Sequence, residues 1–300
     1  MNNVKYKEIT CKTALNKVKG GFPYKWDLNI YRGCIHNCKY CYAVYSHKYI
    51  ESDNFFSDIH VKANIVDELE KQLKSKSWKR EVINIGGVTD SYQNAEKEYK
   101  IMPEILKLLI KYETPAIIST KSKLILRDYD LIDELSRITY INIASTITTM
   151  DKKVCSLLEA NASASLERFE ILKTFRKTNA SVGLHTMPII PFLTDQRENI
   201  DSLFYHAKES GVHYVLTGSL YLRGETRNVF FNFILRNYPE LYKKIYMLYN
   251  AKNANKEYKN DLYKMVNSLR EKYILSSNYN VIMKEKMKPY EKYNPQLKLF

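Results

Sequence analysis

The stretch Cys34-Ile35-His36-Asn37-Cys38-Lys39-Tyr40-Cys41 places three cysteines within eight residues. Thiolates are the usual protein ligands of iron–sulfur clusters, and closely spaced cysteines let one loop wrap a compact metal core. We therefore predict that Cys34, Cys38 and Cys41 hold a [4Fe–4S] cluster. Three ligands for four irons would leave one iron open to a further ligand.

Two other interpretations of these cysteines stay open. One is a zinc site with His36 as the fourth ligand, and the other is three unrelated thiols in a reducing cytosol. Structural zinc usually takes four ligands from two separated pairs, whereas His36 lies inside the first cysteine spacing, so the pattern favours a cluster. Only Cys11 and Cys155 remain outside the motif, which is too few for a second four-cysteine site.

Length and composition are compatible with one large domain, or with one domain and an appendage. The 300 residues, 45% of them hydrophobic, can bury a substantial core. An odd number of cysteines and the polar start MNNVKYKEIT are not typical of a secreted disulfide scaffold. No apolar run approaches the roughly 20 residues that cross a bilayer. We expect a cytoplasmic protein without a membrane anchor.

The net charge of +14 and the sequence pI near 9.3 are compatible with a polyanionic partner such as DNA. Lys, Asn, Ile and Tyr are all abundant, as an AT-rich genome would produce, and this composition gives a basic surface without any such partner. Charge alone leaves both interpretations open.

Short apolar segments alternate with amphipathic helical segments along the chain. The predicted strands are 28–32, 82–85, 115–119, 140–144, 181–184 and 212–216, and the predicted helices between them are 63–73, 103–112, 130–136, 166–174 and 200–210. This alternation predicts an α/β fold with a parallel sheet, in which ligands collect at the carboxyl ends of the strands. The first strand would lead the chain into the cysteine loop.

The sequence changes character beyond Gly224. We divide the chain into a core at 1–226 with an irregular lead-in at 1–26, a helical extension at 227–283, and a flexible basic tail at 284–300. The extension is predicted to contain two helices, at 228–250 and 261–274. Their tyrosines are expected to pack in a core rather than to stack on nucleic acid.

The spacing C-x3-C-x2-C, with Tyr40 before the last cysteine, resembles the signature of the radical S-adenosylmethionine (radical SAM) enzymes. The resemblance implies a partial (β/α)6 barrel, which agrees with the six predicted strands. It also implies that SAM chelates the open iron, that Tyr40 lies against the adenine, and that a donor such as flavodoxin or ferredoxin supplies electrons.

Polar residues after the second, third and fourth strands resemble SAM-binding segments of that family. Gly86-Gly87 resembles the glycine-rich segment that contacts the methionine part of SAM, although a tight turn is the alternative. The other expected SAM contacts are Thr89, Asp90, Ser119, Lys121, Ser145 and Arg168. Helix capping or a solvated surface are alternatives for most of them, and Arg168 has a structural ion pair with Glu159 as its alternative.

A wider set of segments resembles the radical SAM proteins related to spore photoproduct lyase, often called DNA repair photolyases. These segments run from YRGCIHNCKYCYA through GGVTDSYQ, TKS, RDYD and PIIPFLTD to LYLRGE and cover about residues 28–240. The lyase carries a hydrogen-donating cysteine after strand two, whereas GGVTD has none. Cys155 comes later in the chain and does not simply replace it, so reversal of thymine dimers by the lyase's route is not implied.

The last five residues, Gln296-Leu297-Lys298-Leu299-Phe300, resemble the pentapeptide with which bacterial polymerases and repair proteins bind the DNA sliding clamp. Leucine and phenylalanine anchors would enter a hydrophobic groove, and a glutamine would add directional hydrogen bonds. We therefore expect Gln296, Leu297, Leu299 and Phe300 to bind the clamp. A tail that packs on the barrel is the alternative.

Our leading hypothesis is a radical SAM enzyme that cleaves SAM to methionine and a 5′-deoxyadenosyl radical and acts on DNA or damaged nucleotides. Lyase-type DNA repair is one form of that activity. One alternative directs the same chemistry to RNA, a peptide or a small metabolite. Another is a clamp-tethered DNA-binding module whose cluster is structural or redox-sensing.

Overall fold

The computed structural model describes residues 4–49 and 54–293, and its largest element is a seven-stranded sheet with the order β10-β9-β8-β7-β6-β3-β2. All neighbours from β10 to β3 are parallel, and β2 (Leu15–Lys17) pairs antiparallel with β3 at the edge. The parallel strands are β3 (Trp26–Leu28), β6 (Ile83–Ile85), β7 (Ala116–Thr120), β8 (Ile141–Thr146), β9 (Ser181–Ile189) and β10 (Tyr214–Ser219).

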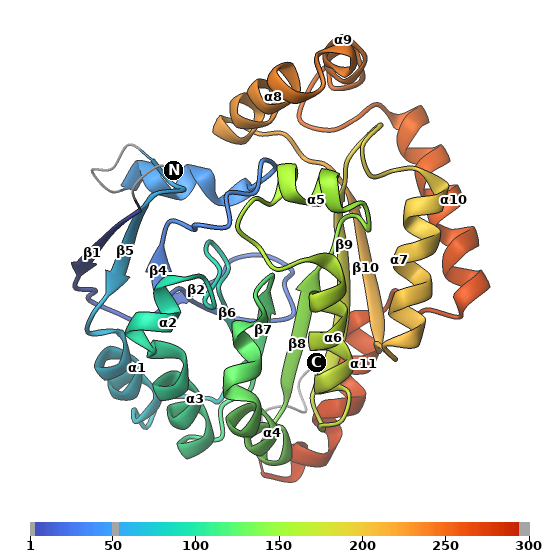
Figure 1. Cartoon of the computed structure of the whole chain (residues 1–300). Helices are drawn as coiled ribbons and strands as arrows, with labels where there is room; N and C mark the ends of the chain where they lie inside the picture. The colour runs from blue at the N-terminus through green and yellow to red at the C-terminus, as the bar shows by residue number, and fades with distance from the viewer. Residues whose placement is uncertain (1–3, 50–53, 294–300) are drawn as a thin grey trace.

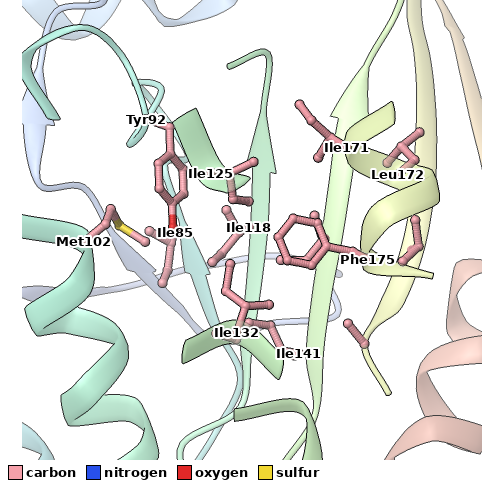
Figure 2. Packing of buried hydrophobic residues seen from close by; sticks show 14 of the residues in the cluster. Ile85, Tyr92, Met102, Ile118, Ile125, Ile132, Ile141, Ile171, Leu172 and Phe175 are labelled. Atoms are coloured by element: carbon pink, nitrogen blue, oxygen red, sulfur yellow. The ribbon is translucent and has the colours of Figure 1, made fainter. Parts of the chain in front are cut away.

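Helices between successive parallel strands cover the outer face of this sheet (Figure 1). They are α1 (Ile65–Leu73), α2 (Ala95–Tyr99), α3 (Ile101–Lys111), α4 (Tyr129–Ile138), α5 (Lys152–Leu158), α6 (Ser165–Phe175) and α7 (Arg197–Glu209). Their apolar side chains pack with those of the strands, as Ile118, Ile132 and Phe175 show (Figure 2). Because six parallel strands follow one another in chain order, the predicted partial (β/α)6 barrel is confirmed.

The predicted strand 28–32 is instead two short strands in different sheets. β3 ends at Leu28, and β4 (Tyr31–Arg32) pairs with β5 (Asp58–Lys62) in a separate three-stranded sheet. β1 (Lys5–Ile9) completes that sheet, so the predicted irregular lead-in contains strands. The prediction was wrong here because a short, mainly apolar segment does not reveal a change of sheet.

The helical extension differs from its prediction in one boundary. The segment 228–250 is divided into α8 (Glu225–Asn237) and α9 (Pro239–Leu248), because the proline suits the first turn of a helix but cannot continue the preceding one. The following helix, α10 (Lys256–Tyr273), packs on α7 and contributes Leu262 and Val266 to the main core. The division of the chain at residue 226 stays a prediction.

The tail predicted to be flexible is helical as far as residue 293. α11 (Tyr279–Met287) and the 3-10 helix η3 (Lys288–Tyr293) follow α10, and Met283 is buried against Val82, Ile117 and Tyr140. This apolar anchor explains the order, and the prediction of a flexible tail is wrong for 284–293. The expected clamp-binding end at 296–300 lies outside the described residues. No helix in the described ranges has the length and apolar composition that a bilayer span needs.

Candidate functional site

A cavity of about 600 Å³ is lined by all three motif cysteines and by residues that follow β6 and β7. This volume is typical of a small-molecule site. Of the predicted SAM contacts, the structure brings the following to the cavity with the cysteines: Tyr40, Gly86, Gly87, Thr89, Asp90, Ser119 and Lys121. From there the cavity extends through the barrel interior toward Tyr214 and Tyr279.

The backbone of the cysteine loop is held by polar side chains that are not expected to be ligands of the cluster. Gln93 accepts a hydrogen bond from the Ile35 N–H at 2.9 Å and donates to the Gly33 carbonyl at 3.1 Å. Thr89 Oγ1 donates to the same carbonyl at 2.6 Å, and Asn161 Nδ2 donates to the Ile35 carbonyl at 2.7 Å. The loop conformation is therefore supported on both sides without use of the thiols.

The chemistry of the three thiols fits a metal cluster. Burial raises the pKa of each thiol, that of Cys38 to about 12, so a cationic metal core is needed to hold them as thiolate ligands. Within the described ranges no three His, Cys, Asp or Glu side chains are placed to hold a single metal ion. A multinuclear cluster spaces its thiolate ligands apart, so this arrangement suits a cluster better than one zinc ion.

Asp90 joins the cysteine loop to β7. Its carboxylate accepts hydrogen bonds from Thr120 Oγ1 at 2.8 Å, from the Tyr92 N–H at 2.9 Å and from the Lys121 N–H at 2.8 Å, and His36 Nδ1 lies 3.2 Å away. Burial raises the pKa of Asp90, but His36 and these hydrogen bonds lower it more, and the net pKa is well below its usual value. The Tyr92 contact closes a turn, and Asn94 rather than Asp90 is the N-cap of α2, so the structure does not show the helix-cap alternative for Asp90. The Asp90 carboxylate instead lies beside His36, the residue that the zinc interpretation needs as its fourth ligand. A contact to SAM stays a prediction.

The glycine pair after β6 is required by close packing. Gly86 has φ +87°, and a Cβ there would lie 2.9 Å from the Thr89 carbonyl oxygen. A Cβ on Gly87 would lie 2.9 Å from both carboxylate oxygens of Asp27 and 3.1 Å from Asn84 Nδ2. Side chains are therefore excluded at this point, and the backbone itself borders the cavity.

A buried ionic network lies behind Cys38. Arg168 Nη1 is 2.5 Å from Glu159 Oε2, both side chains are fully buried, and Tyr40 Oη donates a hydrogen bond to Glu159. Lys121 Nζ lies 5.8 Å from the centre of the Tyr40 ring. Burial lowers the pKa of Lys121, but Cys38 and Glu159 raise it more, so the net pKa is raised. At this wall of the cavity, the Tyr40 ring is fixed in position and the Lys121 ammonium supplies a positive charge.

Ser145 and Arg168 differ from the prediction, because neither lines the cavity. Ser145 Oγ is buried and donates to the Thr120 carbonyl at 2.7 Å. Arg168 uses its guanidinium on Glu159 and on the Thr146 carbonyl at 2.8 Å. Arg168 fits its ion-pair alternative, whereas Ser145 fits neither helix capping nor a solvated surface, because it bonds across the sheet from β8 to β7. Arg168 reaches the cavity residue Tyr40 indirectly, through Glu159.

Cys155 and His185 are two further groups near the site that the motifs do not include, and only His185 lines the cavity. Cys155 lies outside the cavity, with Arg168 Nη2 at 3.8 Å from its sulfur, so it does not occupy a hydrogen donor's place there. His185 does line the cavity, and its Nε2 is 3.3 Å from Tyr214 Oη. Burial and the positive charge of Lys121 lower the pKa of His185 to about 4, which keeps the imidazole neutral at pH 7.

Sequence reasoning missed two sets of site residues. Gln93 and Asn161 hold the loop. Gln93 is the last residue of the segment GGVTDSYQ, and Asn161 lies near the start of LEANASASLERFE. Their polar side chains within these segments were the only signal in the sequence. The second set comprises large apolar side chains that line the cavity and remain exposed: Phe22, Tyr42, Met187 and Tyr221. Only Tyr42, directly after Cys41, had a position that pointed to the site.

Comparison with protein families and curated proteins gives concordant matches. The family model of the Radical SAM superfamily matches residues 28–204. An uncharacterized protein of Mycobacterium tuberculosis is 32% identical over 253 residues, which cover 83% of this chain and 74% of that protein. An uncharacterized protein of Methanocaldococcus jannaschii is 29% identical over 268 residues, which cover 88% and 93% of the two chains.

Two solved structures share the fold at low sequence identity. A mutant spore photoproduct lyase with bound AdoMet and dinucleoside spore photoproduct has a TM-score of 0.65 and 13% identity, covering 89% of this chain and 79% of that chain. Streptococcus suis SuiB bound to S-adenosylmethionine has a TM-score of 0.51 and 12% identity, covering 84% and 49%.

Proposed function

Because the chain belongs to the radical SAM superfamily, we propose that it is an enzyme that cleaves SAM reductively and acts on DNA or on damaged nucleotides. The superfamily uses a [4Fe–4S] cluster and SAM, and Cys34, Cys38 and Cys41 are the residues that would hold the cluster. The observation that carries the assignment is that these three thiols line one cavity with the strand-end residues. When bound, the cluster and SAM supply a 5′-deoxyadenosyl radical and methionine by one-electron cleavage of the C5′–S bond.

Each wall of the cavity has a different part in binding SAM. The backbone at Gly86 and Gly87 permits close approach of the methionine part, and the Lys121 ammonium attracts its carboxylate. The Tyr40 ring, tied to Glu159 by its hydroxyl, offers a fixed apolar surface to the adenine. Thr89 and Asp90 hold the cysteine loop in position.

The rim of the cavity supports a nucleobase as the substrate group. Phe22, Tyr42 and Tyr221 are exposed aromatic side chains that line the cavity, and flat bases stack on such rings. The net charge of +14 is compatible with a phosphate backbone at the same site. RNA remains the competing nucleic acid, and a small metabolite is the competing substrate class.

The test is anaerobic reconstitution followed by measurement of 5′-deoxyadenosine with and without DNA. We expect wild-type protein to bind a cluster and form 5′-deoxyadenosine, the Cys34→Ala variant to lose both, and Cys155→Ala to keep both. Full cluster and SAM cleavage in Cys34→Ala would contradict the cluster assignment. An increase in 5′-deoxyadenosine formation with damaged DNA, but not with RNA or peptides, would support DNA as the substrate. If no DNA increases it, the proposal of a DNA substrate is wrong.

We also propose that the C-terminal residues 296–300 bind the DNA sliding clamp, which would bring the enzyme to replicating or repaired DNA. Pull-down of the clamp should succeed with the full chain and fail with a chain ending at Pro295. Equal recovery by both proteins would remove this proposal and leave the radical chemistry untouched.

A further inference from the structure

The cysteine loop has an inner and an outer face. His36, Cys38 and Tyr40 line the cavity, whereas the alternating residues Asn37 and Lys39 do not. The Lys39 ammonium instead donates to Asn37 Oδ1 at 2.7 Å on the other side of the backbone. Lys39 therefore marks the outer face of the loop and is joined directly to the ligand Cys38.

An exposed arginine and a phenylalanine ring complete this outer face. Arg236 of α8 lies within electrostatic range of the Lys39 ammonium, and Lys39 Nζ is 5.8 Å from the centre of the Phe56 ring. α8 is fastened to the loop, because Thr226 Oγ1 donates to the Cys41 carbonyl at 3.0 Å. We call Lys39, Phe56 and Arg236 the outer patch.

The two cations of the outer patch have no carboxylate as a salt-bridge partner in the described part of the chain, and the sulfur of Cys38 is the anionic group within electrostatic range of Lys39. No acidic side chain in the described ranges forms a salt bridge with Lys39 or Arg236. Two neighbouring like charges repel each other, so their juxtaposition lowers stability unless an anionic partner covers them. The patch thus has the charge of a surface that receives an acidic partner.

We propose that the outer patch is the docking face for an acidic one-electron carrier protein. The inference rests on the proposed function, because each reductive cleavage of SAM needs one electron from outside. The carrier would be oxidised by one electron and the cluster reduced by one, with no proton or covalent bond transferred. The path is short, since Lys39 is bonded to the ligand Cys38.

The outer patch lies on the face of the cysteine loop that points away from the cavity, and this separation favours an electron carrier over a nucleic acid as its partner. None of Lys39, Phe56 and Arg236 lines the cavity, whereas the exposed aromatic rim that suits a base does. Phe56 adds an apolar ring beside Lys39, and transient electron-transfer contacts are small and are steered by charge. A carrier on the outer patch would leave the cavity free, so carrier and substrate would bind at the same time.

The experiment compares two reductants on the reconstituted full-length protein. 5′-Deoxyadenosine formation is measured with reduced flavodoxin, an acidic protein, at subsaturating concentration, and with reduced methyl viologen, a small cation. The variants are Lys39→Glu and Arg236→Glu, and the matched control is Lys208→Glu, an equal charge change on the exposed surface of α7. Iron content is measured for each protein.

We expect both patch variants to slow the flavodoxin-driven rate about tenfold or more and to leave the viologen-driven rate within about twofold of wild type. Lys208→Glu should match wild type with both reductants. The proposal is overturned if Arg236→Glu accepts electrons from flavodoxin as fast as wild type. It is also overturned if the patch variants lower the flavodoxin-driven and the viologen-driven rates by the same factor. It is also overturned if the variants lose DNA binding and keep the flavodoxin rate, which would assign the patch to DNA. Failure of wild type with methyl viologen would refute the proposed function instead.

Discussion

The buried Glu159–Arg168 pair gives a quantitative test of how the cavity wall is built. The perturbation is Glu159→Gln, which keeps the shape of the side chain and removes its charge. Arg168 then remains fully buried without a counter-charge, although it keeps the carbonyl oxygens of Ser163 and Thr146 as acceptors. The same change weakens the acceptor of the Tyr40 hydroxyl.

The magnitude follows from the burial of the pair. Removing one partner of a buried ion pair costs about 3–5 kcal/mol, and the remaining acceptors of Arg168 place the loss near the lower end, about 3 kcal/mol. For a chain of this length that corresponds to a decrease in Tm of about 5 °C. The exposed helix pair Glu104–Lys107 has a separation of 2.7 Å, and its Glu104→Gln variant should lose only about 0.5 kcal/mol.

The assay is urea unfolding of wild type and both variants at pH 7 and at pH 4. Burial raises the pKa of Glu159, but Arg168 and Lys121 lower it more, so the net pKa is lowered. The stability from its ionisation is complete above the unfolded value of about 4.3 and is lost as the pH falls toward the lowered folded pKa. The difference between wild type and Glu159→Gln should therefore be largest at pH 7 and should only begin to narrow at pH 4. Equal losses for Glu159→Gln and Glu104→Gln at pH 7 would refute this reasoning.

Three further changes separate the roles of individual groups. Gly87→Ala should weaken SAM binding at least about tenfold in equilibrium dialysis, because its Cβ would lie 2.9 Å from Asp27, whereas Gly21→Ala, with open space around it, should bind normally. Lys121→Met should raise KM for SAM about tenfold with unchanged iron content, because the variant loses the ammonium that attracts the SAM carboxylate. An unchanged KM would exclude contact between Lys121 and that carboxylate. Burial and nearby cations lower the pKa of His213 to about 4, so wild type should lose stability from pH 6.5 to pH 4, and His213→Gln should lose less; parallel pH curves would contradict this.

The sequence was sufficient for the parallel sheet because each of its central strands is buried on both faces. Segments such as 115–119 and 140–144 are short and mainly apolar and lie between amphipathic helices, and few other folds accommodate that order. The strand pair near the cysteine loop was misread because Leu28, Ile30 and Tyr31 are apolar or aromatic and only Asn29 interrupts them. Nothing in this short segment shows that its halves lie in different sheets.

Long-range pairing explains most of what sequence reasoning did not find. β1 reads as a charged segment, and it forms a strand because β5, 53 residues away, supplies its hydrogen-bond partners. α11 mixes apolar and basic residues without a clear stripe, yet Met283 packs against Val82, Ile117 and Tyr140 next to β6, β7 and β8. Likewise the choice between a ligand role and a structural role for Arg168 depends on whether Glu159 lies beside it in space. No local pattern contains that information.

The way in which the cysteine loop is supported bears on how the cluster is assembled. In small zinc domains the metal supplies the folding energy, because the apo segment has no other contacts. Here Gln93, Thr89 and Asn161 bind the loop backbone, and the thiols make little contribution to that network. The metal-free loop can therefore hold its cysteines around the cavity, and the energy of cluster binding goes to ionising buried thiols rather than to folding the loop. With the proposed assignments, a site ordered in this way would separate its two tasks, because SAM would bind on the inner face and the electron carrier on the outer face.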